Sequence, residues 1–220
     1  MATQRSPSMI GNFRGRIDNV ILTEWRGISV LKKEASKLKK KKLSDEQITN
    51  TNVFGTVSNF LRSAKRAFRI GYQVPRKAGF TPWNAIVSDH LKNAITIHKG
   101  QAVFDLSKVQ LSKPIHKTQQ VWNPVISAES GYKVTLRWEL TPEPEKCTRM
   151  DDKVILACYD GNTGRFSTYY TGVSRSALSY TVDFLDWHAG HDMYWYVFMV
   201  SDNGKLVSET EYLGMVTVRP

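Results

Sequence analysis

Alternating positions near the N-terminus predict a β-hairpin. Residues 16–25 are dense in β-branched and aromatic types, and period-two spacing would place five residues on one strand face: Ile17, Asn19, Ile21, Thr23 and Trp25. Val20 and Leu22 would lie on the other face. Arg26-Gly27 then supplies a turn, and residues 28–31 return as a second short strand. Because an isolated two-stranded ribbon is only marginally stable, the hairpin is expected to cover a small core or to dock on a partner.

Further along the chain, apolar residues recur at the spacing of α-helices. Ser44 and Gln47 form a capping-box pair, in which each side chain bonds to the backbone N–H of the other. The helix that they open, with Gly55 as the place where it would be interrupted, carries an apolar stripe of Val57, Phe60, Leu61, Ala64 and Phe68. After a break at residues 72–79, a second helix begins with Thr81 as N-cap and Pro82 at its first position. Its apolar face comprises Trp83, Ile86, Val87, His90, Leu91, Ala94 and Ile95, so His90 is expected to be a core or boundary residue.

From His98 onward the pattern has the period of β-strands. Short strands are expected at residues 102–106 and 109–111, a linker at 113–124, and longer strands at 134–140, 154–159, 166–171, 179–184, 193–201 and 206–218. Strands that recur about every ten residues, separated by clear turn sequences, predict a β-sandwich. The strand around Trp138 resembles the Trp-bearing strand of fibronectin type III-like domains. Tyr194, Tyr196 and Phe198 would share one face and are expected in a core rather than as a platform for stacking bases or sugars.

These patterns predict an α+β protein with two domains. Residues 1–117 would form a basic module made of an N-terminal β-hairpin and two helices. Residues 118–220 would form an immunoglobulin-like or fibronectin type III-like β-sandwich.

Charge is distributed unevenly between these two parts. The 220-residue chain has a net charge of +11, but residues 1–117 hold 22 Lys and Arg against 7 Asp and Glu, whereas residues 118–220 hold 9 against 13. A strongly basic region attracts polyanions such as DNA, RNA or an anionic surface, through counterion release and long-range attraction. Opposite charges in the two parts also permit head-to-tail association of copies of the chain.

One face of the first helix is cationic and lacks carboxylates. Arg62, Lys65, Arg66 and Arg69 recur at helical spacing, nearly opposite the apolar stripe. They have none of the acidic partners that usually balance a solvated helix face, although a solvated face remains the alternative. The lysine run at residues 37–42 is either a solvated linker or a segment that binds phosphates without sequence preference. The residues expected to bind a polyanion are Arg14, Arg16, Arg26, Lys39, Lys40, Lys41, Lys42, Arg62, Lys65, Arg66 and Arg69.

Catalytic and metal-binding patterns are missing from the sequence. It contains neither a Walker-type phosphate loop nor a dinucleotide fingerprint, and its two cysteines, Cys147 and Cys158, do not have zinc-ligand spacing. The His188 and His191 pair falls in an expected inter-strand loop and is a weak metal signal. We therefore expect a protein that is not an enzyme and has no metal or cofactor. With no signal peptide or membrane-spanning stretch, a cytoplasmic protein with two free thiols is expected, one disulfide being the alternative.

Several motifs resemble those of a family of uncharacterised bacterial proteins of similar length. The N-terminal motif is Gly11-x-Phe13-x-Gly15-x-Ile17-x-Asn19-Val20-Ile21, followed by Trp25-Arg26-Gly27 and the lysine-rich segment. Later matches lie at residues 81–85, 91–95, 109–112 and 212–214, so the resemblance extends over almost the whole chain. It implies membership of that family and no particular activity. Family members often have a serine where Arg14 stands, so this chain is more basic at its first turn.

Two functions from different classes follow. The first is a non-enzymatic binding protein whose basic N-terminal half engages nucleic acid or another polyanion. The alternative is a structural or assembly protein, in which the N-terminal arm contacts another subunit of a homo-oligomer or a larger complex.

Overall fold

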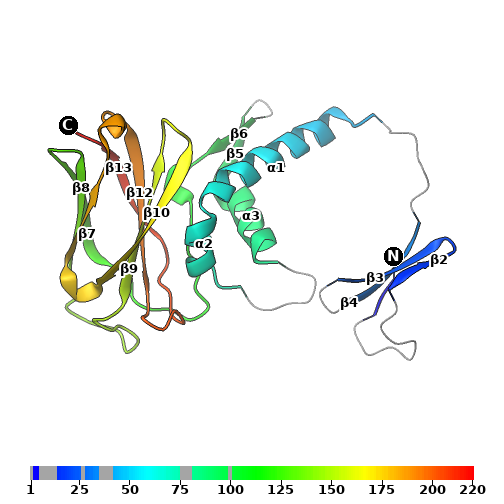
Figure 1. Cartoon of the computed structure of the whole chain (residues 1–220), viewed down its shortest axis with the longest axis horizontal. Helices are drawn as coiled ribbons and strands as arrows, with labels where there is room; N and C mark the ends of the chain where they lie inside the picture. The colour runs from blue at the N-terminus through cyan, green and yellow to red at the C-terminus, as the bar shows by residue number, and fades with distance from the viewer. Residues whose placement is uncertain (1, 5–13, 26–27, 35–41, 75–80, 99–100) are drawn as a thin grey trace. The chain divides into compact units, whose positions relative to one another are not determined.

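The computed structural model describes residues 2–4, 14–25, 28–34, 42–74, 81–98 and 101–220 (Figure 1). The chain divides into two compact units. The smaller unit comprises Met1–Ile48 and Arg76–Thr81, and the larger unit comprises Thr49–Pro75 and Pro82–Pro220.

The smaller unit contains, within its described residues, a four-stranded antiparallel sheet of order β1-β4-β3-β2. The strands are β1 (Ala2–Gln4), β2 (Gly15–Ile17), β3 (Val20–Trp25) and β4 (Ile28–Lys33). β3 and β4 pair in antiparallel fashion, and the predicted turn at Arg26 and Gly27 lies outside the described residues.

The prediction of one strand over residues 16–25 is wrong, because a turn at Asp18 and Asn19 separates β2 from β3. Asp18 has a φ of 51°, a left-handed conformation that Asp tolerates better than most residues. Ile17 consequently pairs with Val20 and shares the face of Val20 and Leu22, opposite to the predicted face.

The described residues form three α-helices, α1 (Asp45–Ser63), α2 (Lys65–Gly71) and α3 (Pro82–Asn93). The predicted capping box is present: the backbone N–H of Gln47 donates to the Ser44 hydroxyl at 3.3 Å, and the Ser44 N–H donates to the Gln47 side chain at 3.0 Å. α1 runs through Gly55 and ends one residue before Ala64. The Ser63 hydroxyl donates to the Phe60 carbonyl oxygen at 2.8 Å, a local bond that competes with the helical pattern. Among the described helices, none is long and apolar enough to cross a membrane.

His90 is a core histidine, as predicted. Its side chain is buried between α3 and residue 110: Nδ1 donates to the Ile86 carbonyl at 2.8 Å, and Nε2 accepts from the Gln110 N–H at 3.3 Å. Burial lowers the pKa of His90, which favours the neutral form needed for this pair of bonds.

Two antiparallel sheets make the β-sandwich of the larger unit. One sheet has the order β10-β9-β12-β13, and the other has the order β11-β8-β7. Their strands are β7 (Trp122–Glu129), β8 (Lys133–Glu139), β9 (Lys153–Asp160), β10 (Arg165–Ser174), β11 (Ser179–Asp183), β12 (Asp192–Val200) and β13 (Glu211–Thr217). A separate hairpin joins β5 (Ile95–His98) to β6 (Gln101–Phe104). This two-sheet arrangement agrees with the predicted immunoglobulin-like sandwich.

Three segments of the strand prediction are wrong. β7 begins inside the predicted linker, where Pro124 and a bulge between Trp122 and Val125 obscure the alternation. Residues 109–111 are not a strand, although Val109 and Leu111 are buried. The last strand begins at Glu211, because residues 206–210 make only two isolated bridges, both at Val207.

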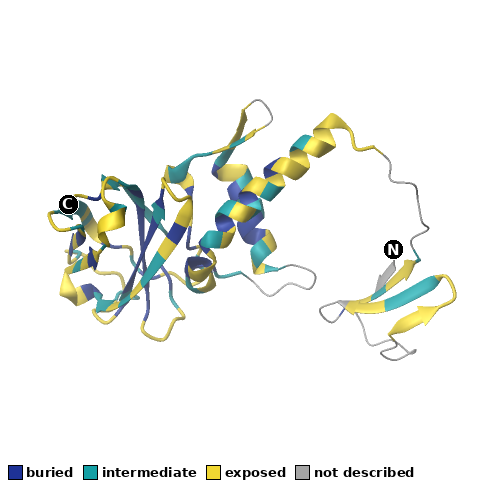
Figure 2. Ribbon diagram, turned by 45° about the horizontal axis from the view of Figure 1, so that its top comes forward, coloured by how far each residue is buried: buried dark blue, intermediate teal, exposed yellow. Residues whose placement is uncertain are grey.

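The central strands β9 and β12 of one sheet are buried on both faces, which gives the larger unit three layers (Figures 1 and 2). Tyr196 and Phe198 pack against the helices, whereas Trp195 and Val197 face the sheet of β7, β8 and β11. The predicted core role of Tyr196 and Phe198 is therefore confirmed, but their core lies between helices and sheet rather than inside the sandwich. Residue 117, the predicted domain boundary, falls within this larger unit, because helices and sheet share a core.

Candidate polyanion-binding groove

Burial of the apolar stripe fixes how α1 and α2 present their other residues. Leu61, Ala64 and Phe68 are buried in the core between helices and sheet. The helix faces that remain accessible carry the cationic residues that interrupt this stripe in the sequence. The predicted spacing survives the break at Ala64, because α2 resumes after a single residue.

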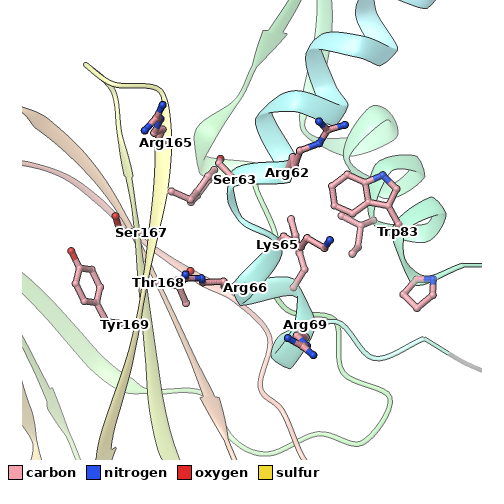
Figure 3. Close-up of a pocket in the computed structure, with 14 residues that line it drawn as sticks. Arg62, Ser63, Lys65, Arg66, Arg69, Trp83, Arg165, Ser167, Thr168 and Tyr169 are labelled. Carbon is pink, nitrogen blue, oxygen red and sulfur yellow. The ribbon is translucent and has the colours of Figure 1, made fainter.

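A groove of about 1170 Å³ lies beside these faces, between α1, α2, the start of α3 and β10 (Figure 3). Five cationic side chains line it: Arg62 from α1, Lys65, Arg66 and Arg69 from α2, and Arg165 from β10. All five are exposed, and the described residues that line the groove include no Asp or Glu. In the described part of the chain, no carboxylate forms an ion pair with any of the five. The groove is therefore a concave surface of one charge sign, which concentrates anions.

The rest of the groove lining combines hydroxyl groups with apolar side chains. Hydroxyls come from Ser63, Ser167, Thr168 and Tyr169, and apolar contacts come from Phe68, Pro82, Trp83, Ile86 and Phe166. Burial raises the pKa of Tyr169, so its hydroxyl stays neutral. Tyr170 joins the two walls, since its hydroxyl donates to the Arg66 carbonyl oxygen at 3.0 Å.

The remaining predicted binding residues belong to the smaller unit or lie outside the described residues. Arg14 forms an ion pair with Glu24, and Arg16 forms one with Glu34 at 2.7 Å. Lys42 is exposed. Arg26, Lys39, Lys40 and Lys41 lie outside the described residues. The structure thus brings together Arg62, Lys65, Arg66 and Arg69 around one groove, and it gives Arg14 and Arg16 acidic partners.

Arg165 is the cation of the groove lining that sequence reasoning missed. It follows the Asp160–Gly164 turn and begins β10, far from α1 and α2 in the sequence. No periodic signal connects it to the helical cations, since only the packing of sheet against helices brings them together.

A second cavity, of about 360 Å³, is lined by Arg165 together with Cys158, Asp160, Trp187 and His188. Burial raises the pKa of Cys158 to about 12, so its thiol is protonated and unsuited to act as a nucleophile. Burial would also raise the pKa of Asp160, but hydrogen bonds from Thr163, from the Asn162 N–H and from His191 lower it. This carboxylate therefore holds the β9–β10 turn. Within the described residues, no group of three His, Cys, Asp or Glu is placed to hold a metal ion.

Comparison with known proteins shows a family match over most of the chain. A family model described as a family of unknown function (DUF6266) matches residues 12–214. No curated protein matches the chain. Two similar solved structures cover about half of it. The fn3 domain of the human collagen alpha-1(XX) chain shares 17% identity over 50% of this chain and 93% of that chain, with a TM-score of 0.36. A structure described as a myokine shares 13% identity over 47% of this chain and 99% of that chain, with a TM-score of 0.32.

Proposed function

Because the chain belongs to DUF6266, a family of unknown function, we propose its function from the groove: it is a non-enzymatic binding protein that engages nucleic acid or another polyanion. One observation carries this proposal. Five cations from a helix pair and a strand line a single groove, and no carboxylate is among the described residues of its lining. A bound polyanion would supply the missing negative charge.

The mechanism is neutralisation of ligand charge inside a partly enclosed surface. Arginine can hold a phosphate or carboxylate with two parallel hydrogen bonds, whereas Lys65 would act as a point charge. Attraction is stronger in the groove than on an open surface, because protein walls lower the effective dielectric constant. Binding would release counterions, so affinity should fall as the salt concentration rises.

The test measures the affinity of a labelled single-stranded oligonucleotide, a duplex and polyglutamate by fluorescence anisotropy, at salt concentrations from about 50 to 200 mM. We expect a salt-dependent complex with at least one of these polyanions. Replacing Arg62, Lys65, Arg66 and Arg69 together by Ala should weaken it and reduce the slope of log K against log salt by roughly three for a single strand.

A matched control separates the groove from net charge. Lys92, Lys146, Lys205 and Arg219 are exposed cations of the larger unit outside the groove lining, and their replacement by Ala removes the same charge. The control variant should bind almost as tightly as the wild type. Equal losses in the two variants, or no polyanion binding by the wild type, would overturn the proposal.

A second candidate function is assembly through the smaller unit. Ile17 and Leu31 lie on the same sheet face as Val20 and Leu22, and they are 66% and 44% exposed. Such an apolar face favours contact with another subunit or complex. Light scattering after size-exclusion chromatography tests it: the wild type should self-associate at high salt without nucleic acid, and I17S/L31S should not.

A further inference from the structure

The groove runs along the outer edge of β10. Residues 165–169 all line it, although successive strand residues point to opposite faces of a sheet. Arg165, Ser167 and Tyr169 share one face, and Phe166 and Thr168 share the other. A cavity bordered by both sets must follow the strand edge, because neither face alone presents consecutive residues.

None of the described strands pairs with that edge. β10 is the terminal strand of its sheet and pairs with β9 on its inner side. Backbone N–H and C=O groups of residues 165–170 that point away from β9 form no hydrogen bond with another described strand or helix. The regular edge ends at a bulge between Tyr170 and Ser174, where Gly172 has a φ of 63°. An edge of this kind can accept an extended peptide as an additional strand.

Cations flank the edge in a way that selects the peptide's side chains. Arg62, Lys65, Arg66 and Arg69 line the helical wall, while Arg165 extends from the opposite face of β10 (Figure 3). An added strand would direct alternate side chains toward the helices, where acidic groups would meet these cations. Five residues of strand would extend for about 17 Å at about 3.3 Å per residue, matching the part of β10 that lines the groove.

We propose that the groove binds an extended acidic peptide segment of a partner protein, which adds to β10 as an antiparallel strand, the direction of the described pairings in that sheet. This inference rests on the proposed polyanion-binding function, because it uses the same cations, and it names the kind of polyanion. A nucleic acid would satisfy the cations but would leave the β10 edge unpaired, since it lacks the alternating amide donors and acceptors of a strand. A second copy of β10 would bring Arg165 and the helical cations close to their own equivalents, which repel.

The experiment changes the ligand and keeps the wild-type chain. The probe is a labelled peptide of about six residues in which Glu and Thr alternate, the length of an ordinary strand. Two isomers carry N-methyl groups on either the odd or the even residues. Each isomer keeps all the charges but loses the N–H donors along one edge of the strand, because successive N–H groups point to opposite sides. Anisotropy is measured at about 50 mM salt, with a single-stranded oligonucleotide of equal charge as comparison.

We expect the unmethylated peptide to bind, one isomer to bind at least about tenfold more weakly, and the other to bind nearly as well. If both isomers bind like the parent peptide, strand addition is wrong and polyanion binding stands. If the oligonucleotide binds and the peptide does not, the acidic-peptide ligand is wrong and the groove is a nucleic-acid site. If neither ligand nor any other polyanion binds, both this inference and the proposed function are wrong.

Discussion

The smaller unit and the groove both carry clustered arginines, but they differ in their carboxylate partners. Arg14 and Arg16 pair with Glu24 and Glu34 on the exposed N-terminal sheet. The groove arginines form no ion pair with a described carboxylate. A paired arginine must give up its partner before it binds an anion. Two surfaces with equal numbers of cations can therefore differ in how readily they bind anions. Net charge by region therefore does not indicate which cations have acidic partners.

The two regions also differ in the support beneath their cations. The groove cations stand on helices that are anchored by Leu61, Ala64 and Phe68, all buried. The N-terminal sheet exposes Ile17 and Leu31. A backbone that is fixed before binding loses less conformational entropy on binding, which favours the groove as a binding surface.

The largest effect is expected on stability, at an arginine whose ion pair is buried. Arg175 bonds to Asp152 at 3.2 Å, with side chains 2% and 0% exposed, and it also donates to the carbonyls of Gln119 and Gln120. Arg175→Met leaves the Asp152 carboxylate buried without its partner and should lower the free energy of unfolding by about 3–5 kcal/mol. Arg16→Met, which breaks the exposed pair with Glu34, should cost about 1 kcal/mol or less. Urea unfolding measures both.

A double variant distinguishes the loss of attraction between Arg175 and Asp152 from the cost of leaving the Asp152 carboxylate buried and unpaired. Asp152→Leu combined with Arg175→Met should recover a large part of the loss, because it removes the uncompensated carboxylate. If the double variant is as unstable as Arg175→Met, the hydrogen bonds to Gln119 and Gln120 carry the effect. Equal losses for Arg175→Met and Arg16→Met would contradict the distinction between buried and exposed pairs.

An intermediate effect is expected from two glycines in the helices that bear the groove. A Cβ at Gly71 would lie 2.6 Å from the Leu111 carbonyl oxygen and 2.8 Å from the Ser112 Cβ, so Gly71→Ala should cost about 1–3 kcal/mol and weaken polyanion binding by displacing α2. A Cβ at Gly55 meets nothing within 4 Å, so Gly55→Ala should add about 0.5–1 kcal/mol of helix stability. Thermal unfolding and anisotropy check both. If the two variants bind the polyanion equally well, the position of α2 does not affect binding in the groove.

The smallest effect is expected in the N-terminal sheet. Replacing Arg14 and Arg16 by Ala removes two positive charges but only from existing ion pairs. Polyanion affinity should then change by less than about twofold, because exposed pairs contribute little free energy. Replacing Arg62 and Arg66 removes the same charge and provides the comparison by anisotropy. A larger loss in the N-terminal variant would place the binding surface in the smaller unit.

Local signals in the sequence predicted much of the scaffold, whereas tertiary packing determined the rest. The capping box at Ser44, the start of α3 at Pro82 and the core position of His90 depend on neighbouring residues, and all three are present. The face of Ile17 was predicted wrongly, because a turn of two residues reverses the strand there and changes its alternation.

For the same reason, the sequence predicted only part of the candidate groove. Helical spacing grouped Arg62, Lys65, Arg66 and Arg69, and burial of the opposite stripe places them together. Arg165 and the free edge of β10 depend on which strand ends a sheet and on how that sheet meets the helices. The periodicity of a single chain segment cannot predict this contact between sheet and helices.

The shared middle sheet links the groove to the cooperativity of the whole larger unit. Because Tyr196 and Phe198 on one face and Trp195 and Val197 on the other are all buried, neither the helices nor the outer sheet can detach without exposing a large apolar surface to water. The groove walls would then be lost only when the entire unit unfolds. A ligand bound in the groove would therefore stabilise the folded state of the whole unit, including residues of the sheet that the ligand does not touch.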